Sequence, residues 1–323
     1  MTLRAVLNAG DRPNAASAGD ARSTALAFAF DADYLAPFKV MLYSMARCGT
    51  LLDCPIYVYS DDPSVFDDAF VRRVADVRRL VDGQDLEELA DIAERHIKRP
   101  ERAKWNRGTC LKWAVFDDAP VDQILFLDVD MLCLRPLEGL LTLHPSAELV
   151  FCPQFQRSAM PAEDTPGAKA AARARLTDML GLRGEVSRRV NSGVMLVRKP
   201  LLSRGLRSRL IAFAKGREDI NEQSHLTNFF RTNRDRSRFV TAVASSAYNF
   251  QENYLDAVDP IDALALLRRI RILHYAGSQK PWRAKITKKD RISFQLWRQF
   301  QSSAIDTGFI DVGAAGEPES GPV

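Results

Sequence analysis

Short apolar or β-branched segments alternate with longer segments of helical periodicity through most of the chain. The apolar segments predict β-strands over residues 25–30, 56–59, 123–127, 149–152, 190–197, 239–243 and 270–274. The periodic segments predict helices over residues 35–47, 65–80, 109–116, 168–180, 201–215, 222–231 and 289–301. Repetition of strand, helix and strand is typical of a mainly parallel sheet flanked by helices, so the pattern predicts an α/β fold.

Both ends of the chain lack this periodicity. They are rich in Gly, Ala, Pro, Ser and Asp, and the N-terminal end has no apolar core of the kind found in a secretory signal. We therefore expect a disordered leader over residues 1–23, a single folded domain over residues 24–304, and a disordered tail over residues 305–323.

Composition narrows the class of protein and its compartment. The chain of 323 residues is 46% hydrophobic and 27% charged, which excludes disorder along its whole length. No segment approaches the roughly 18 to 20 consecutive apolar residues of a membrane-spanning helix. Five cysteines without a C-x-x-C pair indicate reduced thiols. These features predict a soluble protein of the cytoplasm.

Positive charge is concentrated near the C-terminus. The net charge is +4, but residues 268–291 carry +8 and the rest of the chain carries −4. Such a segment is either a solvated basic helix or a contact site for an anionic partner. For the part over residues 283–291 we expect peripheral contact with an anionic membrane, at the inner membrane face. Nucleic acid is not expected as a partner, because no nucleic-acid-binding module accompanies the charge.

Two carboxylates interrupt an apolar segment in the middle of the chain. Asp128 and Asp130 directly follow the predicted strand over residues 123–127, and apolar residues resume after them. Burial of two unpaired carboxylates is costly, and a divalent cation would neutralise both. The alternative is that both side chains are exposed acids in a turn.

A second acidic pair follows the first predicted strand. Asp31 and Asp33 precede Tyr34 at the carboxyl end of that strand, where ligands bind in open α/β sheets. The ring of Tyr34 offers a stacking face for a nucleoside, and the carboxylates can accept hydrogen bonds from ribose or base. The alternative is that Asp33 caps the next helix and that Tyr34 is simply packed.

A third group of residues follows the last predicted strand. His274 at a strand end can complete a metal site with two carboxylates, Gly277 allows close backbone approach to a phosphate, and Lys280 supplies a positive charge. Pro281 and Trp282 follow directly. A lone histidine is more often a structural residue, but the fixed offsets of the Gly, Lys and Trp favour a site.

Weaker signals come from four polar positions. Asn191 and Ser192 precede a glycine within the predicted strand over residues 190–197, Gln223 follows Glu222 at a helix start, and Lys112 lies on a predicted helix. Taken alone, they predict a turn, a helix cap and a surface lysine.

In order and spacing, these residues resemble glycosyltransferase family 8, which includes glycogenin and bacterial lipopolysaccharide galactosyl- and glucosyltransferases. The resemblance covers about residues 25–285, and its most distinctive element is His-x-x-Gly-x-x-Lys-Pro-Trp over residues 274–282. It implies one nucleotide-sugar-binding domain of GT-A type with a Rossmann-like sheet. It also implies an enzyme that transfers a hexose from a UDP-sugar to a glycan, lipopolysaccharide or other hydroxyl acceptor, with retention of configuration.

The resemblance also implies roles for individual residues. It assigns the metal, Mn²⁺ or alternatively Mg²⁺, to Asp128, Asp130 and His274. It assigns contacts with uracil and ribose to Asp31, Asp33 and Tyr34. It assigns contacts with the donor sugar to Lys112, Asn191 and Gln223, and contacts with the diphosphate to Gly277 and Lys280. Ser192, next to Asn191, is assigned to the same binding site. Positive charge from a cation and Lys280 would stabilise the UDP leaving group in the transition state.

Retention requires either a double displacement or attack from the leaving-group face. Gln223 is a poor nucleophile because its amide is neutral, so we favour front-side attack by the acceptor, with Gln223 steadying an oxocarbenium-like centre. Two departures from the family pattern affect donor identity. Glu222 replaces a common aspartate, and Gln154 replaces a carboxylate that often contacts the donor sugar.

Two other functions use a similar nucleotide-binding sheet. A sugar nucleotidyltransferase would carry a Gly-rich, basic phosphate loop after its first strand, where this chain has Asp31 to Tyr34. A non-catalytic nucleotide-sugar binder can keep all of the metal ligands, so turnover is what separates it from an enzyme.

Overall fold

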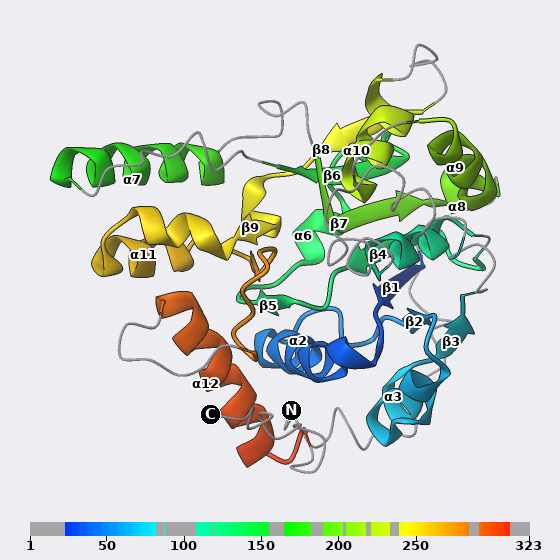
Figure 1. Cartoon of the computed structure of the whole chain (residues 1–323), viewed down its shortest axis with the longest axis horizontal. Helices are drawn as coiled ribbons and strands as arrows, with labels where there is room; N and C mark the ends of the chain where they lie inside the picture. The colour runs from blue at the N-terminus through cyan, green and yellow to red at the C-terminus, as the bar shows by residue number, and fades with distance from the viewer. Residues whose placement is uncertain are drawn as a thin grey trace.

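The computed structural model describes residues 23–81, 87, 108–117, 119–154, 165–181, 190–202, 205–217, 221–232, 239–283 and 291–310. Within these residues, a main sheet has the strand order β3-β2-β1-β4-β7-β6-β8, and a small sheet has the order β5-β10-β9 (Figure 1). The strands are β1 (Thr24–Ala29), β2 (Ile56–Ser60), β3 (Val77–Leu80), β4 (Gln123–Leu127), β5 (Met131–Cys133), β6 (Leu149–Pro153), β7 (Val190–Arg198), β8 (Thr241–Val243), β9 (Phe250–Gln251) and β10 (Ile272–His274). The α-helices are α2 (Leu35–Cys48), α3 (Ala69–Val74), α6 (Glu138–Leu141), α7 (Pro166–Gly181), α8 (Lys199–Leu202), α9 (Leu206–Lys215), α10 (Glu222–Thr227), α11 (Pro260–Leu267) and α12 (Ile292–Asp306).

The main sheet is largely parallel. Strand β1 runs parallel to β2 and β4, β2 to β3, and β6 to β8. Strand β7 is antiparallel to both of its neighbours, β4 and β6. This arrangement confirms the predicted α/β fold with a mainly parallel sheet flanked by helices.

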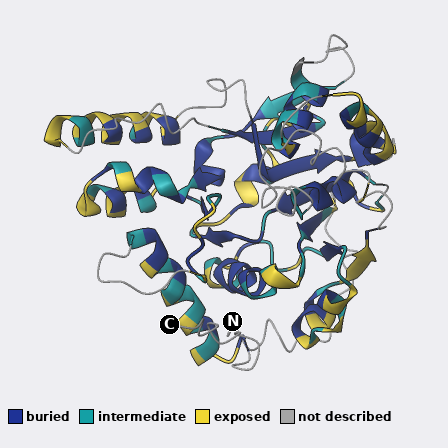
Figure 2. Cartoon of the chain, viewed as in Figure 1, coloured by how far each residue is buried: buried dark blue, intermediate teal, exposed yellow. Residues whose placement is uncertain are grey.

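Two apolar cores lie on opposite faces of the main sheet. Alternate residues of β4 point to different cores: Leu125 and Leu127 pack in the core that contains Phe38 of α2. Phe126 packs in the other, which contains Trp113 of the 3₁₀ helix η3 (Leu111–Phe116). Because both faces of the strand are covered, its residues 124–127 form a continuous apolar run (Figure 2).

The prediction of one helix over residues 65–80 is wrong. This region forms a 3₁₀ helix η2 (Pro63–Asp67), the short helix α3 and the edge strand β3. The carboxylate of Asp68 accepts hydrogen bonds from the backbone N–H groups of Phe70 and Val71, so it caps a new helix. Pairing with β2 then draws the following segment into the sheet.

Three other predicted helices differ in detail. The helix over 201–215 divides into α8 and α9 at Gly205, whose φ of 55° is in the left-handed region that favours glycine. The helix over 109–116 is the 3₁₀ helix η3, and the helix over 222–231 continues from α10 into a π-helical turn η5 (Asn228–Thr232).

The small sheet was not predicted as a unit, because β5 and β9 are only three and two residues long. It forms beside the main sheet, where β10 pairs antiparallel with β5 and parallel with β9. The folded part of the chain continues past residue 304, because Phe309 and Ile310 are buried in the core behind α12.

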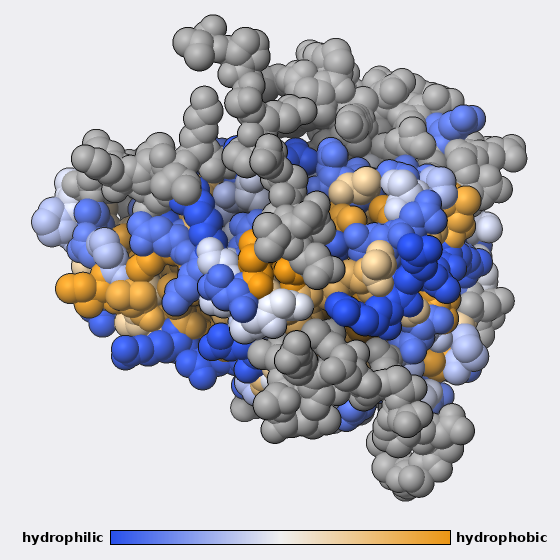
Figure 3. Space-filling view, turned by 90° about the horizontal axis from the view of Figure 1, so that it is seen from below, coloured by the Kyte–Doolittle hydropathy of each residue, from blue (hydrophilic) through white to orange (hydrophobic). Residues whose placement is uncertain are grey.

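On the face shown in Figure 3, separate apolar patches lie between hydrophilic regions. Among the described residues, large exposed apolar side chains include Ile261 and Leu264 of α11. None of the helices in the described ranges combines the length and apolar character that a bilayer crossing requires.

Candidate metal centre

Asp128 and Asp130 lie where the main sheet meets the small sheet. The backbone N–H of Asp128 donates to the carbonyl of Gly193 at 2.8 Å, which extends the pairing of β4 with β7 by one residue. The carbonyl of Asp130 accepts from the N–H of Tyr275 at 2.9 Å, directly after β10. The two carboxylates are thus fixed by backbone hydrogen bonds to different sheets and are not exposed acids in a free turn.

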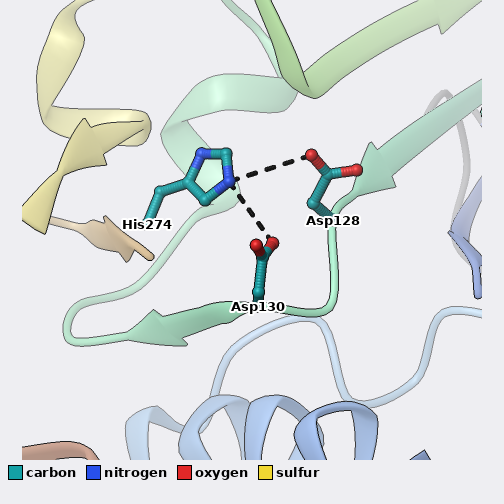
Figure 4. Close-up of side chains that lie close together, drawn as sticks. All are labelled: Asp128, Asp130 and His274. Carbon is teal, nitrogen blue, oxygen red and sulfur yellow. Dashed lines mark ion pairs between the residues drawn. The ribbon is translucent and has the colours of Figure 1, made fainter. Parts of the chain in front are cut away.

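His274 is the last residue of β10, opposite Met131 of β5. Its Nε2 lies 3.3 Å from Oδ1 of Asp130 and 3.9 Å from Oδ2 of Asp128, and the ring faces both carboxylates (Figure 4). One ligand atom from each of the three residues lies within 4.8 Å of the others. Two carboxylates with one imidazole are a donor set that suits Mn²⁺ or Mg²⁺.

Gly193 of β7 is required by close packing behind this cluster. A Cβ at this position would lie 2.7 Å from Cε1 of His274, 2.8 Å from Oδ2 of Asp128 and 2.7 Å from Cε of Met131. No ordinary contact is this short, so any side chain would displace the candidate ligands.

Lys280 neutralises Asp130. Its Nζ donates to Oδ2 of Asp130 at 2.6 Å and to the carbonyl of Tyr275 at 2.6 Å, and both side chains are buried. Burial alone would raise the pKa of Asp130, but the charge of Lys280 and the contact with His274 outweigh it and hold the pKa far below its usual range. Asp130 is therefore ionised and available as a ligand.

Lys112 does the same for Asp128. Its Nζ donates to Oδ1 and Oδ2 at 2.8 and 3.0 Å. Burial would lower the pKa of Lys112, but Asp128 and Glu222 raise it overall, so the lysine is charged. Because the two lysines balance the charges of the two aspartates, a bound divalent cation would leave this site with a net positive charge, which is suited to binding an anion.

Glu222 extends this network through Ser192. The Ser192 hydroxyl donates to Oε2 of Glu222 at 2.8 Å, and Nζ of Lys112 lies 3.4 Å from the same hydroxyl oxygen. Burial, helped by the charge of Asp128, raises the pKa of Glu222 to about 7 against the opposing effects of Lys112, Ser192 and Trp113. Glu222 is thus the one described carboxyl of this network whose pKa is near neutrality.

The residues after β1 lie near Lys280. The ring of Tyr34 has Nζ of Lys280 at 5.9 Å from its centroid, the guanidinium of Arg283 at 5.8 Å, and the ring of Trp282 at 5.8 Å edge-on. Burial raises the pKa of the Tyr34 hydroxyl, with a further contribution from Asp130. Asp33 is exposed and pairs with Arg283 at 3.3 Å.

The side-chain amide of Asn191 is hydrogen-bonded through its oxygen but not through its nitrogen among the described residues. Its Oδ1 accepts from the N–H of Gly193 at 2.8 Å and from Nδ2 of Asn249 at 2.9 Å. Its buried Nδ2 has no hydrogen-bond partner among the described residues. A donor group is thus free to bind a ligand.

The other predicted residues are Gln223, Gly277, Asp31 and Gln154. Gln223 is in the first turn of α10, and none of the hydrogen bonds found in the described residues involves its side-chain amide. At Gly277 a Cβ would find its nearest neighbour, the backbone nitrogen of Gln279, 4.0 Å away, so the protein itself leaves room there. Asp31 and Gln154 are partly buried after β1 and β6. The roles of these residues in binding stay predictions.

Sequence reasoning missed Asn249. It is buried between Asn191 and His274, and its Oδ1 lies 2.7 Å from Nδ1 of His274. A single asparagine before a two-residue strand carries no motif, so only the folded structure identifies it.

Comparison with known proteins gives a family and a fold. The sequence model of glycosyl transferase family 8 matches residues 25–285. No curated protein sequence matches the chain. Solved structures of similar fold include an active-site mutant of LgtC, at a TM-score of 0.56 and 18% identity over 86% of this chain and 95% of that chain. The galactosyltransferase LgtC in complex with donor and acceptor sugar analogs gives 0.55 and 19% over the same shares. GlyE of Streptococcus pneumoniae TIGR4 gives 0.53 and 18% over 93% of this chain and 67% of that chain.

Proposed function

Because the chain belongs to glycosyl transferase family 8, we propose that it transfers a hexose from a UDP-sugar to a hydroxyl acceptor, with Mn²⁺ or Mg²⁺ and with retention of configuration. The observation that carries the proposal is the cluster of Asp128, Asp130 and His274, each flanked by groups that hold it in place. A nucleotide-sugar binder without activity would share this cluster, so turnover is the decisive measurement.

In this proposal the two aspartates and Nε2 of His274 hold the cation. When bound, the cation supplies positive charge for the diphosphate of UDP as the bond to the sugar breaks. Lys280 is placed to add to this charge, since it is buried beside Asp130 and can turn its ammonium toward a phosphate. Space at Gly277 supports close approach of the same diphosphate to the backbone.

Tyr34, Asp31 and Asp33 are proposed to bind the nucleoside. The Tyr34 ring centroid lies 5.9 Å from Nζ of Lys280, so we propose that uracil on this ring and a diphosphate at Lys280 belong to one ligand. Asp31 and Asp33 follow β1 directly and offer acceptors for ribose hydroxyls.

Lys112, Ser192, Asn191 and Gln223 are proposed to bind the donor sugar. The free Nδ2 of Asn191 supports a contact with a sugar hydroxyl. Gln223 is proposed to steady the oxocarbenium-like centre while the acceptor attacks from the leaving-group face. The naming of LgtC as a galactosyltransferase makes UDP-galactose the first donor to test.

The acceptor is proposed to be a glycan or a lipid-linked sugar, bound by a cytoplasmic protein that touches an anionic membrane. Most of the basic segment 283–291 lies outside the described residues. Its described ends are both paired, Arg283 with Asp33 at 3.3 Å and Arg291 with Glu252 at 3.2 Å. Cosedimentation with anionic vesicles at low salt, lost at high salt, tests this contact.

Thermal unfolding with UDP, with Mn²⁺ and with both tests the binding site. A ligand at about 100 times its dissociation constant adds roughly 2.7 kcal/mol of stability. We expect a shift that requires both ligands and that is absent in Asp130→Asn, with Asp178→Asn, an exposed carboxylate of α7, as the matched control.

Release of UDP from UDP-galactose and UDP-glucose, with and without chelator, tests turnover. An anomeric proton coupling in the product that matches the donor would establish retention. A folded wild-type protein that binds UDP and Mn²⁺ but transfers sugar to neither water nor any acceptor would refute the enzymatic part and leave a binder.

A further inference from the structure

We propose that Asn249 is a positioning residue that keeps the proton of His274 on Nδ1 and so leaves Nε2 free to bind the cation. This inference rests on the proposed function for the role of the cation. The contacts that fix the tautomer are those of the protein alone.

The backbone N–H of Gly193 fixes the orientation of the Asn191 amide. The backbone N–H of Gly193 can only donate, and it lies 2.8 Å from Oδ1 of Asn191, so this side-chain atom is an oxygen. The same oxygen lies 2.9 Å from the amide of Asn249, which must therefore present its Nδ2. If the Asn249 amide were turned over, two oxygens would face each other.

The remaining atom of Asn249 then decides the tautomer. Once Nδ2 points to Asn191, Oδ1 faces Nδ1 of His274 at 2.7 Å. An amide oxygen can only accept, so Nδ1 of His274 carries a proton and donates it. Nε2 is left to face Asp128 and Asp130, as Figure 4 shows. Without Asn249, the nearby acceptor for a histidine proton is Oδ1 of Asp130, 3.3 Å from Nε2. A proton drawn there would occupy the nitrogen that the cation needs.

We call the hydrogen-bonded series Gly193, Asn191, Asn249 and His274 the relay. Burial restricts its side chains to one orientation. Asn191, Asn249 and His274 are exposed by only 1, 3 and 3%. Water has little access to replace a lost partner, so each amide keeps the orientation in which its hydrogen bonds are made. In metal sites, a partner that orients a histidine ligand in this way affects metal affinity about 10- to 100-fold.

The relay also joins the two sheets. Asn191 lies near the start of β7 in the main sheet, whereas Asn249 directly precedes β9, the parallel neighbour of β10 in the small sheet. The imidazole on the small sheet is therefore oriented relative to Asp128, which is anchored on the main sheet. A displacement of one sheet relative to the other would therefore move His274 away from its position beside Asp128.

Three variants separate positioning from general destabilisation. Asn249→Leu removes the acceptor for Nδ1 at similar volume. Asn249→Asp restores an oxygen there. Asn253→Leu makes the same type of change four residues on, at a partly buried position outside the relay. We expect Asn249→Leu to bind Mn²⁺ about 10- to 100-fold more weakly than wild type, Asn249→Asp to recover most of the affinity, and Asn253→Leu to match wild type.

Nitrogen-15 NMR of the metal-free protein gives an independent readout. Four histidines are present, and a His274→Gln spectrum identifies the signals of His274. At about pH 8.5, above the ordinary histidine pKa, we expect the His274 proton on Nδ1 in wild type and a shift toward Nε2 in Asn249→Leu. The wild-type spectrum alone shows which nitrogen of His274 carries the proton. The measurement therefore tests the inference even if Asn249→Leu does not fold.

Two results would overturn this inference alone. One is a wild-type His274 with its proton on Nε2. The other is a folded Asn249→Leu that binds Mn²⁺ as wild type does. Neither measurement uses a UDP-sugar, so failure of sugar transfer with an intact Asn249 effect would refute the proposed function and leave the relay standing. A wild-type protein that binds no Mn²⁺, alone or with UDP, would refute both.

Discussion

Glu222 makes the stability of this protein dependent on pH in the neutral range. It is buried beside Ser192 and Lys112, and burial raises its pKa from 4.5 to about 7. If the unfolded chain keeps the ordinary pKa, this difference corresponds to about 3 kcal/mol. We predict that Glu222→Gln, which keeps the shape but cannot ionise, removes this dependence.

The sign follows from proton binding. Between about pH 4.5 and pH 7, the folded carboxyl holds a proton that the unfolded chain has lost. The free energy of unfolding of wild type must therefore fall as the pH rises through this range, and must level off above it. Relative to the Gln variant, wild type loses about 3 kcal/mol, or roughly 5 °C in Tm for a domain of this size.

Urea denaturation of both proteins, free of metal and in steps from about pH 5 to about pH 8, measures the difference. Subtraction of the two curves removes the contributions of other groups, such as Glu252, whose pKa burial also raises.

Glu138→Gln is the matched control. Partial burial raises the pKa of Glu138, but hydrogen bonds from Thr50 and Leu51 lower it overall. Its contribution is lost only as the pH falls below the ordinary glutamate range, so this variant should run parallel to wild type above about pH 5.

A parallel pair of curves for wild type and Glu222→Gln would refute the reasoning, because it would mean that Glu222 binds no extra proton on folding. A difference that grows in the opposite direction, with wild type gaining stability as the pH rises, would show that Lys112 outweighs burial and that the carboxyl is already ionised.

Four further predictions concern the site. Gly193→Ala should lower Tm and weaken Mn²⁺ binding more than tenfold in calorimetry, because its Cβ would lie 2.7 Å from His274. Gly277→Ala should leave Tm of the free protein unchanged, since space exists there, but weaken UDP binding in the presence of Mn²⁺. Lys280→Met should cost about 3 to 5 kcal/mol by stranding buried Asp130, and Mn²⁺ should raise Tm more in this variant than in wild type. Gln223→Ala should lower kcat while UDP affinity, measured by calorimetry, stays unchanged.

The fold could be predicted wherever the local pattern and the tertiary environment agree. Strand β4 has the predicted bounds, since burial on both faces favours the apolar run over 124–127, and Gln123 at its start is buried with its amide hydrogen-bonded to Thr24. The prediction for residues 77–80 was wrong because their exposed side chains, Val-Arg-Arg-Leu, are compatible with a helix. It is a strand because the edge of β2 offers backbone partners, which a local pattern does not record.

The candidate ligands could be predicted for a different reason. Asp128 and Asp130 break an apolar run, and His274 begins a dense group of special residues, so each is visible within ten residues of sequence. Their convergence within 4.8 Å follows from strand pairing, because His274 lies opposite Met131, the residue after Asp130. Spacing along the chain is informative here, since both segments are short and lead directly into paired strands.

Asn249 shows where such reasoning stops. It lies 25 residues from His274 and 58 from Asn191, with no repeated spacing between them. Its role depends on the direction of one backbone N–H at Gly193, which fixes two amides and an imidazole in turn. A hydrogen-bond relay of this kind is defined by orientation rather than by residue type, so an asparagine that orients a metal ligand and one that merely fills a turn look alike in sequence. The same logic predicts that relatives which replace Asn249 should supply another buried acceptor to Nδ1 of the equivalent histidine. A structure with an apolar residue there and an unchanged metal site would show that Asp128 and Asp130 alone orient the imidazole.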